Sequence, residues 1–132
     1  AAVGVFNGCF YTDPTTGKPT FSNFYPGSVN ITQGTINADV IDDPSQMFLI
    51  QHDGTSAATD YGKNADVVVA AGSTTTGVSA MELDTSTINT TAALNLKIIG
   101  LWSAPDNAVG ANAVVVVKIN EHLYGSAGVA GQ

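Results

Sequence analysis

The sequence contains no arginine and little charge of either sign. Lysine supplies all four basic side chains, and charged residues make up 11% of the chain, against roughly 25% in a typical globular protein. The formal net charge is −7. Because nucleic acids and anionic membranes are bound through clustered basic side chains, we expect neither as a partner. A surface built mainly from Thr, Ser, Asn and Gly suits either an extracellular protein or one that neighbours cover in an assembly.

The chain also lacks disulfide pairs and membrane-spanning runs. Its single cysteine, Cys9, cannot form an internal disulfide, and we expect it to be a small buried hydrophobic residue. The longest apolar run, AVVVVKI, is interrupted by Lys118 and falls short of the roughly 20 residues that a spanning helix needs. No secretory signal pattern is present. The chain opens almost directly on a strand-like stretch, so the presence of an additional segment upstream is an open question.

What the sequence does contain is a series of short β-strand patterns separated by turn residues. We expect an all-β fold, a compact antiparallel β-barrel or sandwich with long loops and at most one short helix, over 55–64. Residues 1–124 are predicted to form a single β domain and residues 125–132 a flexible tail of small residues. The expected strands cover residues 2–11, 35–41, 46–52, 64–71, 78–83, 94–101 and 113–124.

Two of these strands have informative side-chain patterns. In the last strand, Val115, Val117, Ile119 and Leu123 are expected to face the core, with Lys118, Asn120 and His122 on the other side. In 46–52, the buried pair is either Met47 with Leu49 or Phe48 with Ile50. The glycines Gly4 and Gly8 in the first strand indicate bulges or close backbone approaches.

The stretch DDPSQMFLIQHDG resembles a catalytic or metal site, because it holds Asp42, Asp43, His52 and Asp53. As a strand it would separate Asp43 from His52 by about 30 Å, at 3.3 Å per residue. Those groups could not then share one metal ion or one proton through the strand. Asp before Pro and Asp before Gly are also typical turn formers. We therefore interpret the stretch as turn, strand and turn.

No other motif supplies catalytic chemistry. Asn120-Glu121-His122 contains one histidine, whereas the zinc motif on a helix needs two with a four-residue spacing. The nucleophile pattern G-x-S-x-G is missing. We accordingly predict no enzymatic activity, catalytic residue, metal or cofactor, and keep a β-fold hydrolase that uses His52 or His122 as a weaker alternative.

Four blocks in order resemble a known family. They are GVFNGCFYTDPTTGKPTFSNFYP, DDPSQMFLIQHDG, GKNADVVVAAGSTTTGVSAMELD and LKIIGLWSAPDNAVGANAVVVVKINEHLY. Together they are similar to small virion proteins of tailed bacteriophages, common in marine and environmental phages, which are regarded as head decoration or capsid cement proteins. The resemblance spans roughly residues 3–124. It implies a location on the outer capsid surface and the major capsid protein as partner, with self-association, a trimer being possible.

The resemblance also implies that aromatic anchors in loops, or a free strand edge, make the contacts. The candidate partner-binding residues are Phe21, Phe24, Tyr25, Trp102 and Tyr124. Phe21 and Trp102 fit core positions equally well. The alternative function is a carbohydrate-binding β-module, either a phage adhesin or a secreted surface domain, in which Trp102 and tyrosines stack on sugar rings.

Overall fold

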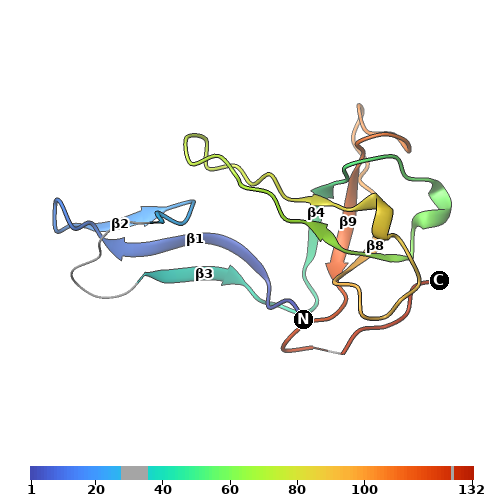
Figure 1. The fold of residues 1–132 in the computed structure, drawn as a ribbon, viewed down its shortest axis with the longest axis horizontal. Helices are drawn as coiled ribbons and strands as arrows, with labels where there is room; N and C mark the ends of the chain where they lie inside the picture. Colours follow the sequence, from blue (N-terminus) through green and yellow to red (C-terminus); the bar gives the residue numbers. More distant parts are fainter. Residues whose placement is uncertain (28–35, 126) are drawn as a thin grey trace.

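The structure, a computed structural model, describes residues 1–27, 36–125 and 127–132, and it confirms an all-β protein. Figure 1 shows the strands arranged in two parts, joined near the N-terminus. Within these residues the chain forms nine strands and two 3₁₀ turns: β1 (Val5–Thr12), β2 (Pro19–Ser22), β3 (Asn37–Ile41), β4 (Met47–Gln51), η1 (Ala58–Asp60), β5 (Asn64–Ala65), β6 (Val67–Val68), β7 (Glu82–Leu83), η2 (Thr85–Thr87), β8 (Leu96–Leu101) and β9 (Val114–Ile119).

The strands form three antiparallel sheets, and none of the described sheets closes into a barrel. Strands β2, β1 and β3, in that order, make a three-stranded sheet that extends away from the rest of the molecule and is called the arm here (Figure 1). Strands β4, β9, β8 and β5 make the main sheet. The two short strands β6 and β7 pair with each other, and the long loop between them reaches back toward the arm (Figure 1).

The arm begins as a hairpin whose turn is organised by Asp13. Between β1 and β2, the Asp13 carboxylate accepts the backbone N–H groups of Thr15 and Thr16, and the Gly17 N–H donates to the Asp13 carbonyl. A register shift lies between Phe6 and Gly8, which confirms a bulge at this glycine. Gly8 has φ of 125°, a conformation that side chains with a Cβ rarely adopt.

The core lies on the inner face of the main sheet. Val115 and Val117 of β9 and Ile98 of β8 are almost fully buried, together with Leu83 of β7. Phe48 and Ile50 of β4 lie opposite β9 residues and pack against this cluster. Of the two pairs that the sequence left open in this strand, Phe48 with Ile50 is therefore the one that points inward. The core is small: within the described residues it holds seven buried hydrophobic side chains, Ala65, Leu83, Leu96, Ile98, Val115, Val117 and Ile119. Cys9 in the arm and Ala113 before β9 are also buried, but they lie outside this cluster.

The prediction for the end of the last strand is wrong. Strand β9 stops at Ile119, and beyond it Leu123 is exposed while Asn120 and His122 are buried. The alternation ends because the chain turns there. The Asn120 side-chain amide donates to the carbonyls of Ala92 and Leu94, and its side-chain oxygen accepts from the Val129 N–H. A polar residue is buried here because every one of these groups finds a partner.

Four other expectations change in detail. Expected strand 64–71 splits into β5 and β6 at Asp66, whose backbone N–H donates to the Thr87 hydroxyl and whose carbonyl accepts from Asp84. The expected helix over 55–64 is the single turn η1, and the second turn, η2, was expected as loop. Asp53-Gly54 is not a hairpin turn, since β4 pairs with β9.

Residues 127–132 lie against the outer side of the main sheet. The Asn64 amide donates to the carbonyls of Thr91 and Val129, and the Gln132 N–H donates to Gly62. The Lys97 ammonium donates to Ala130. This segment, expected as a flexible tail, thus has defined partners. None of the described residues forms a helix long and apolar enough to cross a membrane.

Candidate functional site

The chain exposes more surface than a self-contained protein of its size. Monomeric proteins of 13.5 kDa have an accessible surface of about 6500 Å². This chain exposes 7873 Å². The excess of roughly 1350 Å² is larger than the roughly 800 Å² that each partner buries in a stable protein interface. Many large hydrophobic side chains among the described residues are exposed, and three surfaces contain several of them each.

The first surface is one side of the arm, called the arm face here and formed by Val5, Phe10, Phe21 and Ile41. Val5 pairs with Ile41, and Phe10 pairs with Phe21 on one side and Asn37 on the other. On regular β3, residues 37 and 41 point to the same side. Val5 and Phe10, five positions apart, therefore share that side only because the bulge inserts one residue between them. All four hydrophobic side chains are exposed.

The arm face carries almost no charge. Among the described strand residues on this side, the one ionisable side chain is Asp39, which accepts a hydrogen bond from Asn7 across the bulge at 3.0 Å. The opposite side of the arm is closed by a short turn. Cys9, fully buried as expected, donates its thiol to the Phe24 carbonyl, which also accepts from the Ser22 hydroxyl. This turn fixes the position of Phe24 and Tyr25.

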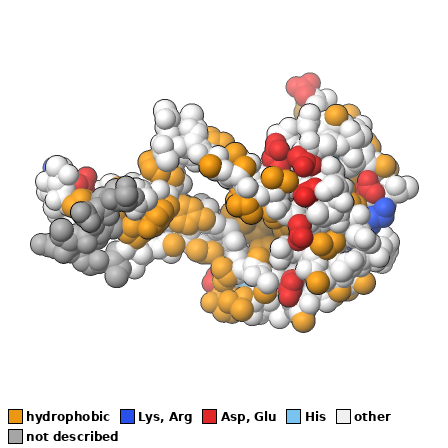
Figure 2. Space-filling model, in the orientation of Figure 1, with side chains coloured by type: hydrophobic (Ala, Val, Ile, Leu, Met, Phe, Trp, Pro, Cys, Tyr) orange, Lys and Arg blue, Asp and Glu red, His pale blue; other side chains and the backbone are white. Residues whose placement is uncertain are grey.

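The second surface is a cleft of about 1140 Å³ between the arm, the β6–β7 loop and the inner face of the main sheet. Figure 2 shows hydrophobic side chains gathered in the region where the arm meets the rest of the molecule. The arm side of the cleft includes Phe6 and Tyr25, and the loop side includes Val69 and Val78. Asn23 packs directly against Gly77, which brings the loop tip up to the arm. The inner face of the main sheet thus opens into a largely apolar hollow.

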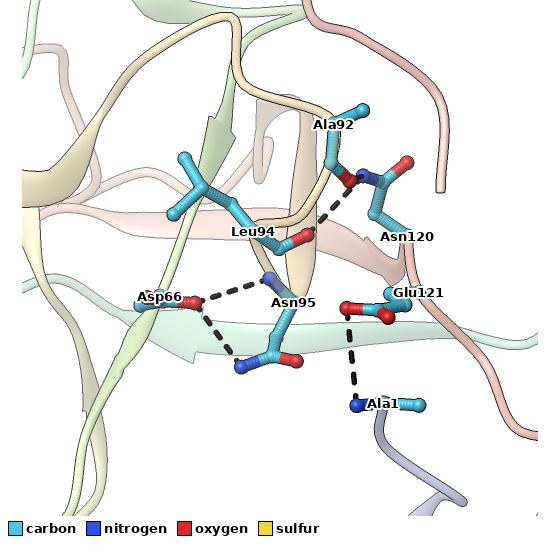
Figure 3. A network of polar contacts seen from close by, with 7 residues as sticks. All are labelled: Ala1, Asp66, Ala92, Leu94, Asn95, Asn120 and Glu121. Carbon is cyan, nitrogen blue, oxygen red and sulfur yellow. Dashed lines mark hydrogen bonds and ion pairs between the residues drawn. The ribbon is translucent and has the colours of Figure 1, made fainter. Parts of the chain in front are cut away.

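The lining of the cleft is mainly apolar, and two of its polar side chains, Asp66 and Asn95, hydrogen-bond to each other. Figure 3 shows that the Asp66 carboxylate accepts two hydrogen bonds from Asn95, through its backbone N–H and its side-chain amide, both at 3.1 Å. The amino group of Ala1 lies 3.8 Å from the Glu121 carboxylate. The Asp66 carboxylate is therefore already hydrogen-bonded at the side of the cleft.

The third surface is the outer side of the main sheet, called the outer face here. The β4–β9 register places Met47 opposite Lys118, and Leu49 opposite Val116. Met47 and Leu49 are each about half exposed, at 55% and 51%. Lys118 also lies directly opposite Lys97 of β8. Two like charges at such a position are unfavourable unless an anionic group neutralises them. Within the described residues, neither lysine forms an ion pair.

The five expected anchor residues lie on separate elements. Phe21 is on the arm face, and Phe24 and Tyr25 lie at the cleft. Trp102 follows β8, where the Asn107 amide donates to its carbonyl, and Tyr124 lies in the turn after His122. Four of the five are exposed and Phe24 is half-buried, so Phe21 and Trp102 are not core residues. The structure brings Phe24 and Tyr25 together with Phe6, but it does not bring all five into one patch.

The acidic residues that resembled a site instead organise turns. The Asp43 carboxylate accepts from the Ser45 N–H at 2.8 Å, as expected of a turn former. The Asp53 carboxylate accepts from both the backbone N–H and the hydroxyl of Thr85. These two hydrogen bonds, the backbone one above all, lower the pKa of Asp53 below its ordinary value of 3.8. Asp53 therefore anchors the η2 segment to the end of β4.

His52 forms a contact that the sequence did not reveal. Its Nε2 atom lies 2.9 Å from the Ser56 hydroxyl, in the spacing of a serine nucleophile and its base. Both residues are buried, and Nδ1 of His52 has no hydrogen-bond partner among the described residues. An activated serine needs access to substrate and a third group that orients the imidazole. The pair provides neither, so we assign it to the packing of the β4 end.

No metal site is formed within the described part of the chain, where three or more Cys, His, Asp or Glu side chains nowhere come together. His122 belongs to no such group, and its Nδ1 atom accepts the Tyr124 N–H in the turn that follows β9.

Sequence reasoning missed several residues of the apolar surfaces, including Phe10 and Val5 on the arm face and Val69 at the cleft. Val5 and Phe10 were assigned to a strand, but a strand pattern leaves open which side is covered. The sequence signal that could have identified them is the bulge at Gly8, which places Val5 and Phe10 on the same side of the strand. That effect can be recognised only once the pairing with β3 is known.

Comparisons with known proteins give no further assignment, since no family model, no curated protein and no solved structure matches this chain.

Proposed function

We propose that this chain is a virion structural protein, a capsid decoration or cement protein that binds the outer surface of the major capsid protein lattice and stabilises the DNA-filled head. The observation that carries the proposal is the excess of exposed surface over that of a monomer, together with the three apolar surfaces described above. A protein that is covered by neighbours on several sides needs this distribution. The four sequence blocks resemble phage decoration proteins, and from this resemblance we infer that the neighbours belong to a phage capsid.

The low charge supports the same function. Flat contacts between many copies are easiest where few charged groups must lose their hydration. In Figure 2 most of the Asp and Glu side chains on the visible face lie over the part that contains the main sheet. The arm, in contrast, shows mainly hydrophobic and uncharged side chains.

We assign contact with the capsid protein to the outer face. Its hydrophobic centre, Met47 and Leu49, lies beside the two opposed lysines, and a carboxylate on the partner would relieve their repulsion. Replacing Leu49 by Asp should then abolish binding to capsids, and replacing Lys118 by Glu should weaken it. Val109→Asp, at an exposed loop position, is the matched control and should bind normally.

The deciding experiment measures stoichiometry. Quantitative mass spectrometry of purified virions that contain this chain should give hundreds of copies per particle, approaching the number of major capsid protein subunits. A few copies located at the tail tip would refute the proposal. Particles that lack the chain should also release DNA at a lower temperature, and adding the purified chain back should restore the original release temperature.

A separate experiment tests the carbohydrate-binding alternative. Trp102 is exposed, but it lies on a different element from Tyr25 and Tyr124, and no described contact joins these rings into a stacking platform. Binding of the chain to a glycan array that is lost in Trp102→Ala would favour that alternative over a cement function.

A further inference from the structure

The arm face and the cleft are both apolar, and neither is covered within the described chain. The arm face belongs to a sheet that stands away from the main sheet, and its two phenylalanines are more than half exposed. The cleft opens onto the inner face of the main sheet, so that Phe48, Ile50 and Val67 pack on the core cluster and also line the hollow. Water in contact with such surfaces makes both of them costly in an isolated chain.

We propose that the arm of one copy docks into the cleft of a second copy, so that the chains associate head to tail through Phe10 and Phe21 of one and Val69, Val78 and Tyr25 of the next. This inference deepens the proposed function, because it names which surface joins the copies to one another and leaves the outer face for the capsid. The inference depends on the proposed function only for where the contact would occur, on a capsid, and not for the contact itself.

Charge favours a second copy as the occupant. Each chain has a net charge of −7, so two copies repel each other wherever their acidic surfaces approach. Among its described strand residues the arm face has Asp39 as its one ionisable side chain, and the Asp66 carboxylate at the cleft is already hydrogen-bonded by Asn95. Copies of this acidic chain can therefore meet on these two surfaces with little unpaired charge buried between them.

The surface area is consistent with the same occupant. In a head-to-tail arrangement each chain contributes its arm once and its cleft once, so it buries two patches. Because a standard interface buries about 800 Å² on each partner, a chain engaged through both surfaces would bury about 1600 Å². The excess exposure of roughly 1350 Å² is of the same magnitude. One type of contact would thereby cover both apolar surfaces, whereas pairing two arm faces with each other would leave both clefts open.

A head-to-tail contact can close into a ring or continue, depending on the rotation between copies. The proposal therefore concerns which surfaces meet, and the experiment tests this directly. Sedimentation velocity of the purified full chain should show an oligomer that dissociates on dilution. A wild-type chain that sediments as a monomer at all concentrations would overturn the proposal.

Two variants separate the surfaces. Phe10→Asp alters the arm face, and Val69→Asp alters the cleft wall at a position that is 83% exposed and so carries little of the fold. Each should weaken self-association by roughly tenfold or more. Val109→Asp adds the same charge on an exposed loop outside both surfaces and should associate like the wild type. Equal weakening by all three variants would show a general charge effect and overturn the proposal.

Mixing the two variants is the sharpest test. The Phe10→Asp chain keeps an intact cleft, and the Val69→Asp chain keeps an intact arm. A head-to-tail contact predicts that the mixture forms a heterodimer although each variant alone is monomeric. Association between two arm faces predicts no complex, and that result would overturn the proposal. Phe10→Ala, which adds no charge, serves as a second arm variant should Phe10→Asp lose its β-sheet circular dichroism.

The outcomes separate this inference from the proposed function. A monomeric chain that still binds capsids in high copy number would refute the arm-in-cleft contact and leave the function standing. A chain that associates as described but is found in few copies per virion would refute the function and leave the contact standing.

Discussion

The rings of Phe10 and Phe21 lie with their centroids 4.9 Å apart at an interplanar angle of 54°, on neighbouring strands of the arm. Such a tilted pair is a favourable aromatic geometry. Both rings are nevertheless more than half exposed, at 55% and 52%. The ring of Phe21 also covers Gly8, where an added Cβ would lie 2.5 Å from its Cζ atom. The apolar side of the arm thus depends on a glycine.

Replacing Gly8 by Ala should therefore disorder the arm and leave the main sheet intact. The new methyl group clashes with Phe21, and alanine is strained at a φ of 125° by about 1–3 kcal/mol. Hydrogen exchange should accelerate in β1 and β2 but not in β8 and β9. Gly100→Ala is the control, because no atom lies within 4 Å of its added Cβ and its φ is not positive. Unchanged exchange in β1 would contradict the role given to Gly8.

Leu83 is expected to be a principal contributor to the stability of the folded chain. It is fully buried in the cluster that joins β7 to the main sheet, and a parallel bridge links it to His52. Leu83→Ala should lower the free energy of unfolding by about 2–5 kcal/mol through lost burial and a residual cavity. Urea denaturation measures this change. Val69→Ala, a truncation at a mostly exposed position, should alter stability by no more than about 0.5 kcal/mol.

Asp53 should make stability depend on pH in the acidic range. Because the hydrogen bonds from Thr85 lower its pKa in the folded chain, its carboxylate stabilises the fold above the unfolded value of about 3.9. That contribution is lost as the pH falls through the folded-state pKa. Asp53→Asn should accordingly have a lower melting temperature than the wild type at pH 7, and the difference should shrink as the pH is lowered below about 4.

The control for this titration is Asp106→Asn. Asp106 is exposed, and its carboxylate accepts no hydrogen bond from any described residue. Its substitution should leave the melting temperature at pH 7 close to that of the wild type. If Asp53→Asn behaved in the same way, the hydrogen bonds to Thr85 would not contribute to folding.

Asn120 should hold the C-terminal segment against the main sheet. Replacing it by Ala removes its three hydrogen bonds and leaves the carbonyls of Ala92 and Leu94 without this donor, at a cost of about 1–3 kcal/mol for each buried group. The Val129 amide should then exchange its hydrogen faster, as measured by NMR. Asn7→Ala removes an exposed side-chain hydrogen bond in the arm and should not affect Val129. Equal protection of Val129 in both variants would contradict this anchoring.

The sequence determined the strands and much of the local turn chemistry. Alternating side chains marked β3, β4, β8 and β9, and Asp13 and Asp43 form the turns that their neighbours Pro14 and Pro44 indicated. These features depend on residues close in the chain, so a linear pattern carries them. The inward positions Val115, Val117 and Ile119 were identified for the same reason.

Tertiary structure decided how the strands are grouped and which sides remain uncovered. Alternation identifies two sides of a strand, but pairing partners far away in the sequence decide which side is buried. The arm became a sheet of its own, and the bulge at Gly8 turned Val5 and Phe10 to one exposed side. Likewise, Asn120 and His122 became buried only because the chain turns after Ile119 and packs there. The apolar surfaces are therefore a property of the folded chain, although every residue in them is visible in the sequence.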